Sequence, residues 1–145
     1  MIIMAIDFGK VRTGLAICDP KEILAFPLEV ITEKNEEILC EKIAKKIDEQ
    51  KVRKIIFGLP KNMDGSLGES AKKVQNIAKI LSQKTDIEID FWDERQTTIA
   101  AHSYLNTTNT RGKKRKSIID AVSATIILEN YLNYRKSSPQ HSPEN

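Results

Sequence analysis

The chain has 145 residues, of which 40% are hydrophobic and 30% are charged, so it suits one globular domain that buries its own core. Its 23 lysines and arginines barely exceed its 20 aspartates and glutamates. The net charge is therefore only weak evidence for a polyanionic partner. Two cysteines without CxxC spacing and two distant histidines signal neither a disulfide framework nor a zinc site. No apolar run approaches the roughly 18 residues of a membrane span, and no export signal is visible, so we expect a reducing, cytoplasmic location.

Three strands and a helix are predicted in the first third of the chain. The apolar runs 2–7 and 13–19 flank the turn-like sequence FGKVR and indicate a hairpin. In residues 27–32, Leu28 and Val30 alternate with Glu29, as in a third strand. From Glu36 onward, apolar residues recur at helical spacing with lysine and glutamate on the opposite face, which predicts an amphipathic helix.

The middle of the chain alternates strand, helix and strand. Residues 54–60 read as a short buried strand that glycine and proline stop, and the polar loop KNMDG follows it. Ser66 and Glu69 have the spacing of a capping box, and the apolar residues after them recur at helical spacing. This pattern predicts a second helix, and the alternation of residues 87–92 predicts a fifth strand.

The last third is expected to be helical, with one basic interruption. A shorter helix is predicted at 97–105, and the polar, basic segment 107–116 is predicted to remain unpacked. Residues 117–134 are apolar over most of their circumference, as in a helix buried against a sheet. We expect one domain, residues 1–136, followed by a disordered tail at 137–145.

This order of elements predicts an α/β fold with a mixed sheet, in which chemistry tends to gather beyond the strand ends. Three acids interrupt apolar segments: Asp7 ends the first strand, Glu94 follows the fifth, and Asp120 lies within the buried stretch of the last helix. A buried carboxylate is unfavourable unless it is paired or holds a metal. If the first and fifth strands end on the same side, the three acids form an all-oxygen cluster of the kind that Mg²⁺ or Mn²⁺ prefers. Two such ions about 4 Å apart can cleave a phosphodiester.

Each acid also has an ordinary structural interpretation. A lone aspartate at a strand end, such as Asp7, is commonly a turn former. Glu94 could pair with Arg95 on the surface. Asp120 is the hardest to explain in this way, because the middle of IIDAVSATII offers it no cap or turn. Composition and pattern leave the metal site and the structural interpretation both open.

Four segments resemble one family in order and at natural spacing. They are IDFGKVRTGLAICD near the start, GLPKNMDGSLGE in the middle, DERQTT after the fifth strand, and KSIIDAVSATIILENYL near the end. Together they resemble, over about residues 2–134, the YqgF/RuvX family of bacterial pre-16S rRNA nucleases, which are related to Holliday junction resolvases. The resemblance implies an RNase H-like fold with a five-stranded mixed sheet, its first three strands antiparallel and helices flanking it.

The resemblance also implies an activity and its residues. It implies metal-dependent nuclease cleavage that matures the 5′ end of precursor 16S rRNA in a pre-ribosomal particle, with Mg²⁺ or Mn²⁺ as cofactor. Asp7, Glu94 and Asp120 are implied as both catalytic residues and metal ligands, with Asp7 bridging two ions. The protein would act as a monomer or a homodimer.

Several basic residues are candidates for holding the nucleic acid. Lys10 and Arg12 lie in the first turn, Lys61 lies beside a helix start that could face an anion, and Arg95 could bind phosphate or pair with Asp93. The run RGKKRK would add salt-sensitive attraction that does not depend on sequence. Its basic members are Arg111, Lys113, Lys114, Arg115 and Lys116.

Other functions remain open at the level of sequence. Four-way junction cleavage is an alternative substrate choice for the same chemistry. A non-catalytic module that binds RNA or the ribosome could keep the fold and the basic loop. The hairpin DFGKVRTGLA is also similar to the phosphate-cradling hairpin of actin-like and sugar kinases, although those enzymes need two lobes.

Overall fold

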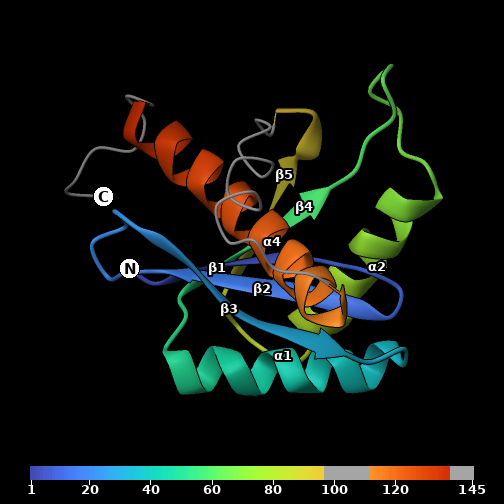
Figure 1. Cartoon of the computed structure of the whole chain (residues 1–145), viewed down its shortest axis with the longest axis horizontal. Helices are drawn as coiled ribbons and strands as arrows, with labels where there is room; N and C mark the ends of the chain where they lie inside the picture. The colour runs from blue at the N-terminus through green and yellow to red at the C-terminus, as the bar shows by residue number, and fades with distance from the viewer. Residues whose placement is uncertain (97–111, 138–145) are drawn as a thin grey trace.

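The computed structural model describes residues 1–96 and 112–137 of the chain (Figure 1). The elements in chain order are β1 (Ile3–Asp7), β2 (Arg12–Cys18), β3 (Ala25–Thr32), α1 (Glu36–Gln50), β4 (Lys54–Leu59), α2 (Glu69–Ser82), β5 (Glu88–Asp93), the short 3-10 helix η1 (Glu94–Gln96) and α4 (Gly112–Ser137). The five predicted strands and the helix predicted from Glu36 are therefore confirmed. The helix predicted at 97–105 lies outside the described residues.

The five strands form one mixed sheet in the order β3-β2-β1-β4-β5. The first three strands pair antiparallel with one another, as expected, whereas β4 and β5 run parallel to β1. The carboxyl ends of β1, β4 and β5 consequently meet at one edge of the sheet, which we call the carboxyl edge.

Helices cover both faces of this sheet (Figure 1). Met4 and Ile6 of β1 pack in the core beneath α1 and α2, whereas Ile3 and Ala5 pack in the core beneath α4. Because successive side chains of a strand point to opposite faces, a strand covered on both sides needs an unbroken apolar run. This explains why the apolar residues IMAI of β1 follow one another without alternation.

The two helices on the first face begin in different ways. Asn35 caps α1 by accepting a hydrogen bond from the Ile38 amide at 3.0 Å. The predicted capping box of α2 is wrong: Gly68 is the N-cap, and no side chain caps that helix. Ser66 instead donates to the Asp64 carboxylate at 2.6 Å. A local turn contact therefore competes successfully for the hydroxyl.

Helix α4 is longer than the sequence pattern predicts. It begins at Gly112 rather than 117 and ends at Ser137 rather than 134. The added first residues are mostly lysine and arginine, which have good helix propensity, so apolar periodicity underestimates the helix. The rest of the predicted tail, 138–145, and the basic residue Arg111 lie outside the described residues. Among the described helices, none is long and apolar enough to cross a membrane.

Candidate active site

Strand register brings Asp7 and Gly58 together at the carboxyl edge. Ile6 of β1 pairs with Phe57 of β4, so the next residue of each strand lies at the same level. Asp7 is two residues beyond Ala5, which packs beneath α4, so Asp7 shares that face of the sheet. Asp7 interacts with its surroundings at this position.

Glu94 reaches the same place from β5. A Cβ built on Gly58 would lie 3.1 Å from Oε1 of Glu94 and 2.6 Å from Cδ1 of Ile127 in α4. The missing side chain at position 58 therefore leaves the space that the Glu94 carboxylate and α4 occupy. Sequence reasoning treated Gly58 only as a strand stop, although glycine inside a buried strand is itself a signal of close approach.

The environment of Glu94 disfavours its negative charge. Burial raises the pKa of Glu94 above its ordinary value, and the nearby Asp93 carboxylate raises it further. Among the described residues, no hydrogen bond or salt bridge compensates this carboxylate. An ionised carboxylate held in such a position is suited to a divalent cation, and the oxygen-only donors here fit a hard ion such as Mg²⁺ or Mn²⁺.

Asp93 and Arg95 form a separate ion pair beside this carboxylate. Nη2 of Arg95 lies 2.6 Å from Oδ2 of Asp93, and Nε donates to both carboxylate oxygens at 3.0 Å. This contact lowers the pKa of Asp93 to about 2. Nη1 of Arg95 also donates to the Met63 carbonyl at 3.3 Å. Arg95 thus connects the loop between β4 and α2 to the end of β5. Of the two roles considered for Arg95 from the sequence, the structure shows the ion pair with Asp93.

The β1–β2 turn is tightly built. A Cβ on Gly9 would lie only 2.1 Å from the Arg12 carbonyl oxygen, so this position requires glycine. The buried Thr13 hydroxyl donates to the Gly9 carbonyl at 3.4 Å. Lys10 lies at the exposed tip of this turn and Arg12 begins β2. On the other side of the carboxyl edge, Lys61 pairs in a bridge with Leu67 and its charge helps to lower the pKa of Asp93.

Two contacts show which end of α4 lies toward the carboxyl edge. The ammonium of Lys54, at the start of β4, lies 5.4 Å from the ring centre of Tyr131. Ile127 packs at Gly58, close to the end of the same strand. The helix therefore runs opposite to β4. Asp120 precedes Ile127 by seven residues, which is about two turns and roughly 10.5 Å along the helix, so its backbone lies on the carboxyl-edge side of Ile127.

The structure thus brings two of the three predicted acids to one edge. The side chains of residues 112–120 lie outside the described part, including those of Lys113, Lys114, Arg115, Lys116 and Asp120. Within the described part, no group of three or more metal-ligating side chains is found. The meeting of Asp120 with Asp7 and Glu94 consequently stays a prediction.

Replacing Gly58 with alanine is expected to displace the Glu94 carboxylate. The new methyl group would meet Glu94 and Ile127 at the distances given above, and both side-chain ends would have to move. Overpacking of this kind destabilises a fold by about 1–3 kcal/mol. A shift of about 1 Å in a reactive group can cost roughly a hundredfold in rate. Chemical denaturation and a nuclease assay check the two effects.

Gly68→Ala is the control for this prediction. A Cβ there would lie 3.4 Å from the nearest atom, Oδ1 of Asn62, which is an ordinary contact distance. Its nuclease activity should match that of the wild type. If Gly58→Ala is equally active, the close approach at Gly58 does not position Glu94.

Comparison with known proteins places the chain within a family. The family model described as "RuvX: Holliday junction resolvase" matches residues 1–134. A relative from Clostridium botulinum is 40% identical over 133 residues, which cover 92% of this chain and 97% of the relative. A relative from Halothermothrix orenii is 44% identical over 135 residues, covering 93% and 96% respectively. Both carry the name "Putative pre-16S rRNA nuclease".

Solved structures share the fold. RuvC from T. thermophilus in complex with a Holliday junction substrate has a TM-score of 0.62 at 12% identity, over 92% of this chain and 96% of that one. The fowlpox virus resolvase with Holliday junction DNA has a TM-score of 0.57 at 10% identity, over 92% and 98%. These likenesses confirm the expected RNase H-like fold. The family match and the identity to the relatives, each across most of the chain, show that this protein belongs to the RuvX family.

Proposed function

We propose that this protein is a metal-dependent nuclease that processes the 5′ end of precursor 16S rRNA. One observation carries the proposal. Asp7 and the half-buried carboxylate of Glu94 lie at one edge of an RNase H-like sheet, where no positively charged side chain among the described residues forms a salt bridge with Glu94. The names of the two relatives support the choice of substrate.

Asp7, Glu94 and Asp120 would hold the metal. When bound, divalent cations supply an activated water and stabilise the oxygen that leaves the phosphodiester. The oxygen ligands fit Mg²⁺ or Mn²⁺. Asp7 is anchored at the end of a fully covered strand, and Glu94 is confined between Gly58 and α4. This confinement fixes the carboxylate before a cation arrives, so little reorganisation is needed on binding.

Basic residues around the carboxyl edge would bind the phosphate backbone. Lys10 and Arg12 approach from the β1–β2 turn, and Lys61 approaches from the loop between β4 and α2. Arg95 is already paired with Asp93, so it would add little net positive charge there. The run from Arg111 to Lys116 directly precedes the helical turns that carry Asp120. Contacts of these types weaken as salt rises and carry no base specificity.

Junction cleavage is the second candidate, because both structural neighbours described above are resolvases with Holliday junctions. A cleavage assay discriminates between the candidates. Precursor 16S rRNA and a four-way DNA junction are incubated side by side with Mg²⁺, Mn²⁺ or EDTA. We expect cleavage of the RNA with either metal and none with EDTA. Cleavage of the junction alone would establish the resolvase instead, and cleavage of neither substrate would leave a binding module.

A further inference from the structure

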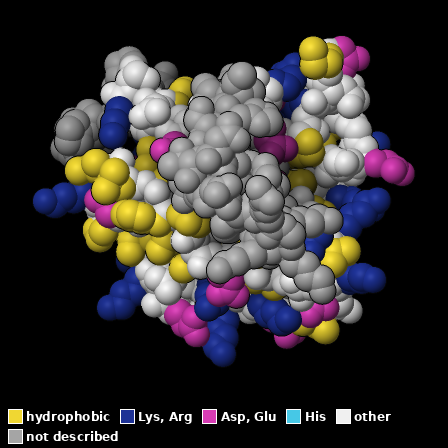
Figure 2. All heavy atoms as spheres, in the orientation of Figure 1, with side chains coloured by type: hydrophobic (Ala, Val, Ile, Leu, Met, Phe, Trp, Pro, Cys, Tyr) yellow, Lys and Arg dark blue, Asp and Glu magenta, His cyan; other side chains and the backbone are white. Residues whose placement is uncertain are grey.

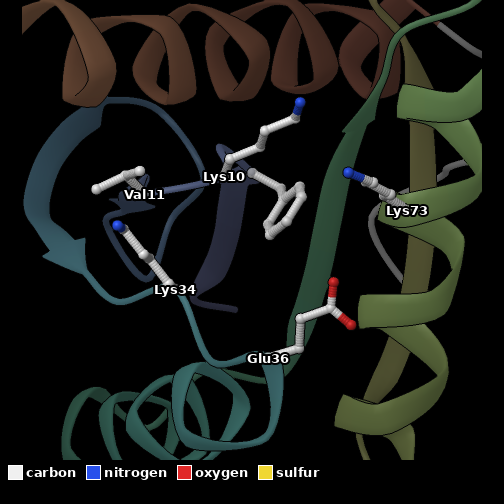
Figure 3. A pocket seen from close by; sticks show the side chains of 6 residues that line it. Lys10, Val11, Lys34, Glu36 and Lys73 are labelled. Carbon is white, nitrogen blue, oxygen red and sulfur yellow. The ribbon is translucent and has the colours of Figure 1, made fainter.

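A pocket lies on the opposite face of the sheet from the carboxylates. It has a volume of about 320 Å³ and is lined by Phe8, Lys10, Val11, Lys34, Glu36 and Lys73 (Figure 3). A second hollow of about 210 Å³ shares Phe8, Lys10 and Lys73 with it and adds Gly9, Pro60, Ser70 and Val74. We call the two together the lysine pocket. Its combined size is within the range of small-ligand sites.

Three separate elements supply the charge of this pocket. Lys10 comes from the β1–β2 turn, Lys34 from the connection before α1, and Lys73 from α2 (Figure 3). Within the described residues, none of these three has a salt-bridge partner. Lys42, Lys46, Lys54 and Lys84 pair with carboxylates, whereas the exposed Lys45 and Lys72 do not pair with any in the part of the chain that the structure describes. What distinguishes Lys10, Lys34 and Lys73 from such exposed lysines is that all three line one pocket. Lysines that gather without carboxylate partners create a local positive potential that favours an anion.

The single acid of the pocket is held by a neighbour. Oε1 of Glu36 accepts a hydrogen bond from Nδ2 of Asn76 in α2 at 3.0 Å. The lining therefore has three lysine side chains and one carboxylate, and that carboxylate already has a partner. Figure 2 shows lysine and arginine side chains along the side of the molecule where α2 and the β1–β2 turn lie. The pocket is thus suited to a phosphate group.

The pocket also has an apolar surface that could contact a base. Phe8 is partly buried, packs against the core beneath α1 and α2, and lines both hollows. Val11 is 39% exposed at the rim. Aromatic rings next to positive charge are the usual means of holding single-stranded nucleic acid, because any base can stack on them.

The β1–β2 turn connects the lysine pocket to the carboxylates. Asp7 and Phe8 are consecutive, so their side chains point to opposite faces of the sheet. Lys10 lies at the tip of the turn, and its ammonium extends toward the side on which α4 lies (Figure 3). A strand that passes over the turn would have one phosphate near Asp7 and a later nucleotide in the lysine pocket.

We infer that the lysine pocket binds one nucleotide of the RNA strand beyond the scissile phosphate. The inference rests on the proposed function and assigns Phe8, Lys34 and Lys73 to substrate binding. The chemistry recognised is a phosphate with an attached base. A free nucleotide presents the same groups, so the test must separate the strand from the mononucleotide.

Fluorescence anisotropy with labelled single-stranded RNA in EDTA tests the inference without cleavage. The double variant Lys34→Ala/Lys73→Ala should bind roughly tenfold more weakly at low salt. The slope of log affinity against log salt should fall by about 1.4, because each contact to a single strand contributes about 0.7. The matched control is Lys45→Ala/Lys72→Ala, which removes two exposed lysines of α1 and α2 that do not line the pocket.

Two further measurements complete the test. Phe8→Leu keeps the apolar packing but removes the ring, and it should weaken binding about threefold or more through lost stacking. Thermal melting establishes that each variant is folded. Equal loss of affinity in the pocket and control variants overturns the inference, because it indicates bulk charge alone. Binding of AMP as tight as that of the oligonucleotide also overturns it in favour of a mononucleotide site.

Failure of the inferred binding site can be distinguished from failure of the proposed nuclease function. If the wild type cleaves no RNA but the pocket variants bind it more weakly than the control, the nuclease proposal fails and the binding site stands. If the wild type cleaves RNA and all variants bind it alike, the binding site fails and the nuclease proposal stands.

Discussion

Asp7→Asn is expected to abolish cleavage while leaving RNA binding intact or tighter. The substitution keeps the size of the side chain at the end of β1 and removes the charge that would hold a divalent cation. Metal ions contribute several kcal/mol of transition-state stabilisation, so the rate should fall about a thousandfold or more. RNA affinity should hold or rise because a negative charge facing the phosphates is lost. A cleavage assay with Mn²⁺ and an anisotropy titration in EDTA measure the two effects.

Asp86→Asn serves as the matched control. Asp86 is exposed, precedes β5 and lies at the end of the sheet opposite the carboxyl edge. The same chemical change there should leave cleavage within about twofold of the wild type, because distant sites act independently. Full activity of Asp7→Asn would remove the basis for metal-dependent cleavage at this edge.

Glu94→Gln is expected to inactivate the enzyme and, in EDTA, to stabilise it. Burial and then Asp93 raise the pKa of Glu94, so its ionised form opposes folding at neutral pH. Glutamine has the same shape without the charge. The variant should therefore melt at a higher temperature than the wild type near pH 7, and its cleavage rate should fall about a hundredfold or more because a metal ligand is lost.

The stability difference between the wild type and Glu94→Gln is expected to depend on pH. A group whose pKa is raised in the folded state binds a proton more readily there than in the unfolded chain. Wild-type stability should consequently rise relative to Glu94→Gln as pH falls from neutral toward the ordinary value of 4.5. The difference in melting temperature should shrink over that window. Asp93 stays ionised throughout it, because its pKa is about 2.

Metal and control measurements test the same carboxylate from another direction. A cation at a hundred times its dissociation constant stabilises a folded protein by about 2.7 kcal/mol. Mn²⁺ should raise the melting temperature of the wild type more than that of Glu94→Gln. Glu41→Gln, an exposed change on α1 with 66% of its side chain accessible, should behave as the wild type. A Glu94→Gln protein that is less stable in EDTA at pH 7 contradicts the assignment.

The sequence pattern was sufficient for the strands and for α1. Both faces of β1 and β4 are covered, so their apolar runs are continuous and bounded, and α1 has one apolar face with Asn35 as its cap. The sequence pattern did not predict the N-cap of α2 or the two ends of α4 correctly. Ser66 bonds locally to Asp64, and α4 continues through basic residues that apolar periodicity does not detect. Helix ends depend on such competing contacts more than on periodicity.

The sequence by itself also identified Asp7 and Glu94 as candidate metal ligands. Carboxylates at the ends of apolar strands are unfavourable there unless they are paired or bind a metal. Only the tertiary structure decided that they share an edge, since strand order and parallel pairing are set by packing between distant segments. It also revealed the Gly58 opening for Glu94 and the gathering of Lys10, Lys34 and Lys73. Periodicity reports whether one segment is buried, whereas a site depends on which segments become neighbours.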